Sequence, residues 1–183
     1  MSTRAATNSL GDLVRAVEVE AHVFADDGAI PNHPTLPLLI YPGALDLPRD
    51  DPAAACEAVF QANGWGGSWR NGIYPFPHYH STAHEVLGIC RGEAKVRLGG
   101  DAGVVRTVHP GDVVVIPAGV GHQNLGATDL LVVGAYPAGQ RWDLCYGKPE
   151  ERPGVLRNIE RVPLPASDPL YGPDGPLRGH WRP

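Results

Sequence analysis

Apolar and polar residues alternate in short runs along this chain, a pattern that predicts β-strands. The clearest run covers 93–98, where Ala94, Val96 and Leu98 alternate with charged residues and so share one strand face. A turn is expected at Gly92, because a second predicted strand ends just before it. The other predicted strands cover 17–24, 84–91, 104–108, 113–116 and 130–136, with an extended edge segment leading into 38–41. Gly and Pro separate these runs, which is typical of tight turns in an all-β domain.

One helix and a long C-terminal segment complete the predicted organisation. A helix is predicted over 51–63, because Asp51 can cap it, Pro52 suits its first turn and Gly64 follows its end. A second, short helix is expected over 153–161, and residues 1–12 are expected to fray. The C-terminal residues are predicted to form an ordered wrap, since a disordered tail rarely carries many large apolar side chains. Those that need burial are Trp142, Leu144, Tyr146, Leu170, Tyr171 and Trp181.

The segment 72–92 carries the first group of chemically distinctive residues. In a strand, His78 and His80 point to the same side, and Glu85 shares a face with Leu87 and Ile89. A carboxylate on an apolar face is costly unless it is paired or binds a metal. The two imidazoles offer partners for a divalent cation. The alternative is a set of hydrogen-bonded core histidines, the usual environment of a single inward histidine.

A second run, 111–126, supplies one more imidazole. Pro117 and the glycines after it shape a tight turn that delivers His122. Three imidazoles and one carboxylate suit a divalent transition metal such as Fe, Mn, Ni, Co or Zn. Cys90 is expected on the opposite strand face from Glu85, so no thiolate is among the candidate ligands. The lack of a thiolate disfavours a closed structural zinc site.

These two runs resemble the paired signature motifs of the cupin superfamily. The first motif is matched at every spacing by Gly72, His78, His80, Glu85 and Gly92. The second is matched by Gly111, Pro117, Gly119 and His122, but Gly126 stands where the family has Asn, and an Asn lies at Asn124. The resemblance implies an all-β fold, the cupin double-stranded β-helix or jelly-roll barrel, with one or two short flanking helices. It also implies that His78, His80, Glu85 and His122 ligate one divalent transition metal.

A narrower resemblance covers nearly the whole chain. The phrases HYHSTAHEVLGI, IPAGVGH, VVGAYP, WDL and DPLYG are similar to the YjlB-like group of single-domain bacterial cupins, a group with no assigned reaction. We therefore expect a single cupin domain over 1–183. Its barrel core is expected at about 65–137, its N-terminal strands and helix at 13–64, and its C-terminal wrap at 138–183.

Composition and charge narrow the classes of partner. A chain of 183 residues is long enough to bury a core without disulfides. Its three cysteines, widely separated and odd in number, are read as reduced thiols of a cytoplasmic protein. A net charge of −5 without a cluster of Lys or Arg argues against nucleic acid and anionic membranes as partners. No signal peptide is expected, and no run approaches the ~18 consecutive apolar residues of a membrane span.

The expected partner is therefore a small molecule. Four protein ligands around an octahedral metal leave about two positions open, which suits a metal-dependent enzyme acting on a small polar metabolite. An oxygen-dependent oxidoreductase of the dioxygenase type is favoured, because the open positions suit O₂. A metal-dependent isomerase or decarboxylase, a non-enzymatic binding module and a purely structural metal stay open.

No catalytic residue is assigned from the sequence. The residues that flank the site and are candidates to line its pocket are Tyr74, Phe76, His84, Asn124 and Tyr136. Core packing is the alternative for the two aromatic residues before His78, and His84 is expected to face away from the metal because it adjoins Glu85. A homodimer is expected from the resemblance to cupins.

Overall fold

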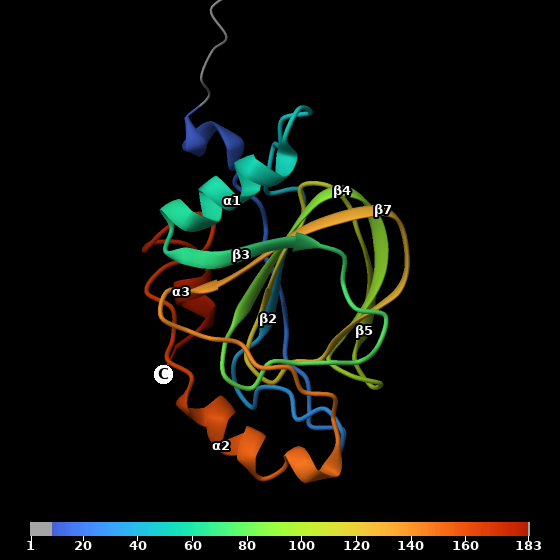
Figure 1. The fold of residues 1–183 in the computed structure, drawn as a ribbon. Coiled ribbons are helices and arrows are strands. Elements are labelled where there is room, and N and C mark those ends of the chain that lie inside the picture. The colour runs from blue at the N-terminus through green and yellow to red at the C-terminus, as the bar shows by residue number, and fades with distance from the viewer. Residues whose placement is uncertain (1–8, 183) are drawn as a thin grey trace, which may run out of the picture.

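The computed structural model describes residues 9–182 and shows antiparallel strands curled into a jelly-roll barrel with helices at both ends (Figure 1). The expectation of fraying over 1–12 falls largely outside the described residues, and a 3₁₀-helix begins at Leu10. The elements in chain order are η1 (Leu10–Leu13), β1 (Glu20–His22), β2 (Leu38–Tyr41), α1 (Pro52–Ala62), β3 (Trp65–Asn71), β4 (Glu85–Leu98), β5 (Val104–Val108), β6 (Val113–Ile116), β7 (His122–Pro137), η2 (Pro149–Glu151), α2 (Gly154–Arg161) and α3 (Leu177–His180). This is the all-β fold that the sequence predicted.

The strands hydrogen-bond in the order β1-β2-β6-β4-β7-β3, and β5 pairs with the far half of β4. Every strand pair is antiparallel. The two longest strands, β4 and β7, pair along most of their length and place His122 opposite Leu98. The start of β4 pairs with the end of β6, so that Glu85 lies opposite Ile116. The signature segments are therefore neighbours in one continuous sheet.

The hairpin turn predicted at Gly92 is wrong, because β4 runs without a break through this residue. Register shifts on both sides of Arg91 mark a bulge in the pairing with β7. Gly92 adopts a φ of 71°, and a Cβ there would overlap the carbonyl oxygen of Thr128. The bulge changes the parity of the strand, so that Ile89 before it and Ala94 after it both face the same apolar cluster.

Most other predicted elements have their counterparts in the structure. The predicted helices over 51–63 and 153–161 are α1 and α2, and the strands over 104–108 and 113–116 are β5 and β6. Asp51 caps α1 by accepting a hydrogen bond from Ala54 N at 3.0 Å. The strand predicted over 17–24 shortens to β1, and the one predicted over 130–136 is only the last part of β7.

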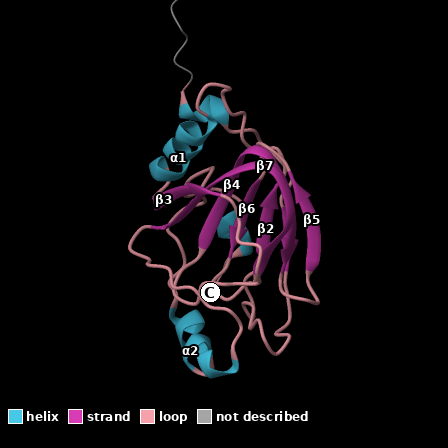
Figure 2. Cartoon of the chain, turned by 45° about the vertical axis from the view of Figure 1, so that its right-hand side comes forward, coloured by secondary structure: helices cyan, strands magenta, loops and turns pink. Residues whose placement is uncertain are grey.

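The central strands are buried on both faces, which explains why β2 and β6 are continuous apolar runs. One face packs inside the barrel, in a cluster that includes Leu38, Leu87 and Val96. The opposite face is covered by α1 and by the C-terminal segment, through residues such as Phe60 and Leu170. Figure 2 shows α1 at one end of the strands and α2 at the other.

The C-terminal segment is ordered up to residue 182, as predicted, and is fixed by buried polar contacts. Trp181 is 3% exposed and donates from Nε1 to the carbonyl oxygen of Pro37 at 2.8 Å. The prediction that all its large apolar residues need burial is wrong for Trp142 and Tyr146, which are 48% and 47% exposed. Trp142 lies beside the site described below, where its exposed face is available to a ligand.

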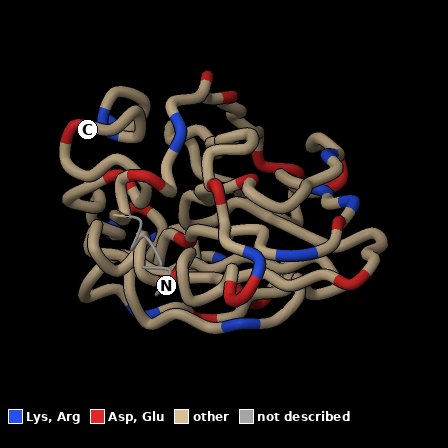
Figure 3. The backbone as a smooth tube through the Cα atoms, turned by 90° about the horizontal axis from the view of Figure 1, so that it is seen from above, with Lys and Arg blue, Asp and Glu red and all other residues tan. Residues whose placement is uncertain are grey.

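Charged residues are scattered over the surface, with acidic and basic positions interspersed (Figure 3). Several of them form ion pairs with residues close by in space, as Arg70 does with Glu57 and Arg152 does with Asp26. Within residues 9–182, no helix combines the length and apolar character needed to cross a bilayer.

Candidate metal centre

Three short segments bring the four predicted ligands together. His78 and His80 lie in the extended segment between β3 and β4, Glu85 is the first residue of β4, and His122 is the first residue of β7. The main chains of His78 and His122 pair directly. His78 N donates to His122 O at 3.2 Å, and His122 N donates to His78 O at 2.9 Å. This pairing sets the two imidazoles side by side, with ring centroids 4.0 Å apart.

The four side chains converge in the interior and are all buried. One ring nitrogen from each of His78, His80 and His122 can be chosen so that all three lie within 4.8 Å of one another. The Oε2 atom of Glu85 lies 3.3 Å from Nε2 of His80 and 3.3 Å from Nε2 of His122. The spacing in the sequence predicted this convergence.

Each imidazole is oriented by a hydrogen bond from its Nδ1 atom to a backbone carbonyl. The acceptor for His78 is Phe76 O at 3.0 Å, the acceptor for His122 is Val120 O at 3.3 Å, and the acceptor for His80 is Asp143 O. A carbonyl can only accept, so the proton resides on Nδ1 in all three rings. In the neutral form of this tautomer, Nε2 carries the lone pair, as it does in histidines that bind a metal through Nε2.

The side chain of Asp143 holds the residue that follows His80. Its Oδ1 atom accepts from Ser81 N at 2.6 Å and from Thr82 N at 3.3 Å, and its Oδ2 atom accepts from the Ser81 hydroxyl. Burial would raise the pKa of Asp143, but the hydrogen bonds from Ser81 outweigh it and lower that pKa. Asp143 therefore ties the loop after β7 to the segment that carries His80.

His84 supports the turn that leads to His122. Its side chain is fully buried, and its Nδ1 atom accepts from Ala118 N at 2.9 Å. Its ring centroid lies 4.7 Å from that of Trp181. His84 thus connects the C-terminal segment with the 117–121 turn and points away from the cluster, as its position next to Glu85 predicted.

Burial and mutual charge set the ionisation of the cluster. Burial and the neighbouring His122 lower the pKa of His78 to about 3, so this ring is neutral. Burial favours the protonated form of Glu85, but His80 and His122 outweigh it and hold the pKa of this carboxyl below its ordinary value. Burial also opposes charge on His80, yet Glu85 more than offsets it and raises the pKa of that ring. An ionised carboxylate thus faces His80, whose protonated form it favours, and the neutral ring of His78 lies beside them.

These donors fit a divalent transition metal. Glu85 is fully buried, and its Oε2 atom accepts no hydrogen bond from any residue in the described part of the chain. A buried anionic oxygen without a hydrogen bond is costly, and a cation at the same point removes that cost. Three imidazole nitrogens with one carboxylate oxygen are suitable ligands for Fe(II), Mn(II), Co(II), Ni(II) or Zn(II). Glu85 favours the protonated form of His80, and binding of a metal to this ring would displace that proton.

A cavity of about 500 Å³ opens onto the cluster. Of the sequence-predicted pocket residues, Tyr74 and Tyr136 line it, whereas Phe76, His84 and Asn124 do not. Phe76 stacks on Tyr74, with ring centroids 4.9 Å apart. Asn124 lies in β7 and accepts instead from Gly126 N at 2.8 Å, where the second motif departs from the family pattern and the pairing with β4 shifts register.

Two tryptophans also line this cavity. Trp69 comes from β3, and its Nε1 atom donates to the hydroxyl of Tyr136 at 2.8 Å. Trp142 comes from the loop after β7 and stacks on Tyr136 at a centroid distance of 6.1 Å and an interplanar angle of 18°. The WDL phrase contains Trp142, but no sequence pattern places this loop over the barrel mouth.

Comparisons with known proteins agree with this geometry. Residues 70–133 match the family described as Cupin domain. The uncharacterized protein YjlB of Bacillus subtilis (strain 168) is 44% identical over 165 residues, which cover 90% of this chain and 97% of YjlB. The chain belongs to the cupin family, in its YjlB-like group. The alignment thus covers nearly the full length of both proteins.

Solved structures that resemble this cupin share less of its sequence. The acireductone dioxygenase from Bacillus anthracis, solved with a cadmium ion in its active center, is 16% identical with a TM-score of 0.37, over 68% of this cupin and 80% of that chain. The 11S globulin from Wrightia tinctoria, described with an auxin binding site, is 20% identical with a TM-score of 0.34. That match covers 42% of this cupin and 21% of the globulin, so the cupin spans about a fifth of the globulin chain.

Proposed function

We propose that this cupin is a divalent-metal-dependent enzyme that acts on a small molecule with oxygen donors. The observation that carries the proposal is the convergence of three imidazoles and the ionised Glu85 at the end of a cavity of about 500 Å³. In a structural zinc site the protein fills all positions around the metal, whereas a catalytic site keeps a position open. Donors that face an open cavity support the second arrangement.

The chain's own residues would divide the work of such a site. His78, His80, Glu85 and His122 would hold the metal, which when bound supplies Lewis-acid activation and a template for an oxygen ligand. Burial and the charge of Glu85 raise the pKa of Tyr136, so its hydroxyl keeps its proton and can donate it to a ligand oxygen. Tyr136 would therefore position the substrate.

Oxygen-dependent oxidoreduction is the reaction class that we favour. Sites for phosphorylated sugars usually contain a free Lys or Arg for the phosphate. The cation in the described lining of this cavity is Arg70, and it is already held by Glu57, at 2.7 Å, and by Asp51, at 3.4 Å. Two open positions on a metal would suit a substrate oxygen together with O₂.

Oxygen uptake tests this proposal. Protein reconstituted anaerobically with Fe(II) is mixed with a panel of small oxygen-bearing metabolites, and O₂ consumption and products are followed. We expect stoichiometric O₂ consumption with at least one compound and none in His122→Ala. Ligands that bind in a metal-dependent manner and return unchanged under all conditions would instead identify a binding module and contradict the enzyme proposal.

A further inference from the structure

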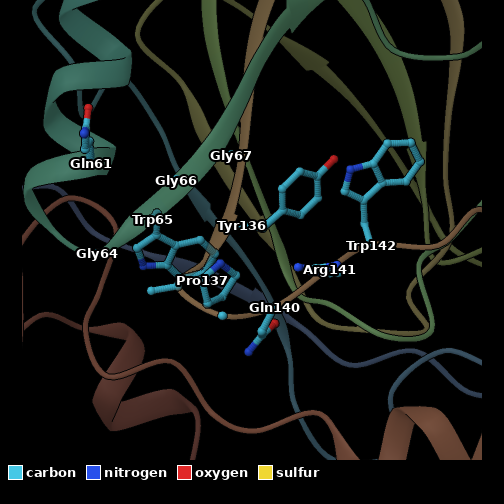
Figure 4. Close-up of a pocket in the computed structure, with 12 residues that line it drawn as sticks. Gln61, Gly64, Trp65, Gly66, Gly67, Tyr136, Pro137, Gln140, Arg141 and Trp142 are labelled. Carbon is cyan, nitrogen blue, oxygen red and sulfur yellow. The ribbon is translucent and has the colours of Figure 1, made fainter.

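The cavity that opens onto the metal centre has an aromatic wall. Trp69, Tyr74, Tyr136 and Trp142 all line it. The ring of Trp142 is stacked on that of Tyr136 and also lies 5.5 Å from the ring of His80, in an edge-on arrangement. Figure 4 shows Tyr136 and Trp142 next to each other. The aromatic wall therefore reaches the metal ligands themselves.

Part of this wall is left exposed by the protein. Trp142 is 48% exposed, although large apolar side chains are usually covered in a folded domain. Trp142, Tyr136 and Gly67 are shared with an adjoining cavity of about 580 Å³, whose other lining residues include Trp65 and Gln140 (Figure 4). Two cavities thus meet at the Tyr136–Trp142 pair, so these rings are available to a ligand in either cavity.

The inner cavity offers little to a charged ligand beyond the metal centre. The guanidinium of Arg70 donates to both carboxylate oxygens of Glu57, at 3.1 and 2.7 Å, so its charge is compensated. Arg141 lies in the outer cavity and does not line the inner one. A ligand in the inner cavity would therefore be held by its oxygen atoms and by contact with rings.

One polar group on the wall is directed by its neighbour. Trp69 Nε1 can only donate, so the Tyr136 oxygen accepts this hydrogen bond and the hydroxyl can still donate its own proton, to Glu85 or to a ligand. Tyr136 can therefore donate to an oxygen of a ligand whose ring lies along the wall. Stacking against Trp142 and a hydrogen bond from Tyr136 would fix both the plane and the edge of such a ligand.

We propose that the ligand of this cupin carries a planar aromatic ring that lies against Trp142 and Tyr136, while its oxygen atoms point to the end of the cavity formed by the three histidines. The inference rests on the proposed function, because the oxygen atoms need the metal. It adds a substrate class, aromatic compounds with adjacent oxygen donors, and assigns Trp142 as the residue that selects for the ring.

Three hydroxamic acids with the same chelating head test this inference without turnover. Protein loaded with Zn(II), which is redox-inert, is titrated with acetohydroxamate, cyclohexanecarbohydroxamate and benzohydroxamate by calorimetry, with tryptophan fluorescence as a second readout. We expect benzohydroxamate to bind about 2- to 10-fold more tightly than its saturated analogue, since a favourable aromatic pair contributes that much beyond buried area. Acetohydroxamate reports the chelating head alone.

Two variants locate the effect. In Trp142→Ala, the preference for benzohydroxamate over the cyclohexane analogue should disappear, while the affinity for acetohydroxamate stays unchanged. Tyr146→Ala is the matched control, because Tyr146 is equally exposed, at 47%, but does not line the metal cavity. It should keep the full preference.

The possible failures are distinguishable. If zinc is retained and acetohydroxamate binds, but the saturated analogue binds as tightly as benzohydroxamate, the aromatic inference is overturned and the metal site stands. A preference that survives in Trp142→Ala also overturns it. If zinc is not retained by the wild-type protein, the proposed function fails, and the inference fails with it.

Discussion

Asp168 is a buried carboxylate whose removal should destabilise the whole C-terminal segment. Its side chain is 0% exposed. Its Oδ1 atom accepts from Leu170 N at 2.8 Å and from Tyr171 N at 3.1 Å. Its Oδ2 atom accepts from the Tyr41 hydroxyl at 2.8 Å and from Leu177 N at 3.0 Å. Four donors from β2 and the C-terminal segment thus depend on one carboxylate.

The Asp168→Asn substitution changes this arrangement in a definable way. The amide oxygen should replace Oδ1, because the backbone amides of Leu170 and Tyr171 can only donate. The amide nitrogen then faces Tyr41, whose hydroxyl can turn and accept, and Leu177 N, which cannot. One stranded buried donor costs about 1–3 kcal/mol, and loss of the charge weakens the other bonds. We expect the free energy of unfolding to fall by about 2–4 kcal/mol.

Urea denaturation in the presence of a chelator measures this loss without a contribution from bound metal. Tyr41→Phe removes a single hydrogen bond to the carboxylate and should cost about 1.5–3 kcal/mol. Asp174→Asn is the control, because Asp174 is an exposed carboxylate in the same segment and should change stability by less than about 0.5 kcal/mol. An Asp168→Asn protein as stable as the Asp174→Asn protein would refute the reasoning.

Three further predictions concern the site and its surroundings. Asp143→Asn should weaken metal affinity about 10- to 100-fold in a chelator competition, since Asp143 holds Ser81 and thereby the segment carrying His80; unchanged affinity would contradict this role. Burial lowers the pKa of His33 to about 4, so the folded protein favours the neutral ring. The stability that this ring contributes is complete above its unfolded pKa of about 6.5 and is lost as the pH falls from there towards 4. His33→Asn keeps an acceptor for Leu36 N and should show a shallower loss of unfolding free energy between pH 7 and 4.5; equal slopes would argue against a half-buried neutral imidazole. Saturating metal at about 100 times its Kd should stabilise the wild-type protein by about 2.7 kcal/mol relative to chelated protein, and equal melting temperatures with and without metal would contradict a site that exists only in the folded state.

The fold could be predicted where local pattern and local geometry coincide. The capping residue and the flanking glycine delimited α1, and continuous apolar character identified β6. The continuity of β4 through Gly92 could not be predicted, because a glycine with positive φ serves a turn or a bulge equally well. The carbonyl of Thr128, on the partner strand, excludes a side chain there, and the identity of that partner is a property of the assembled sheet.

The candidate site, too, could be predicted only in part from the sequence. The spacing of His78, His80, Glu85 and His122 predicted their convergence, and their role as ligands stays a prediction. Their orientation depends on backbone carbonyls such as Asp143 O, which is 63 residues from His80 in sequence. Long-range contacts of this kind leave no periodic signal. The same holds for the position of the loop that carries the aromatic wall.

Elemental analysis tests the central claim most directly. Untagged protein is purified without chelator under exclusion of oxygen, beside His122→Ala and beside His109→Ala, which removes an exposed histidine with a side chain 58% accessible. We predict about one equivalent of a divalent transition metal per chain in the wild type and in His109→Ala, and a large loss in His122→Ala. Absence of metal from the wild-type protein, even after reconstitution, would contradict the proposed centre and leave a buried histidine cluster without a cation.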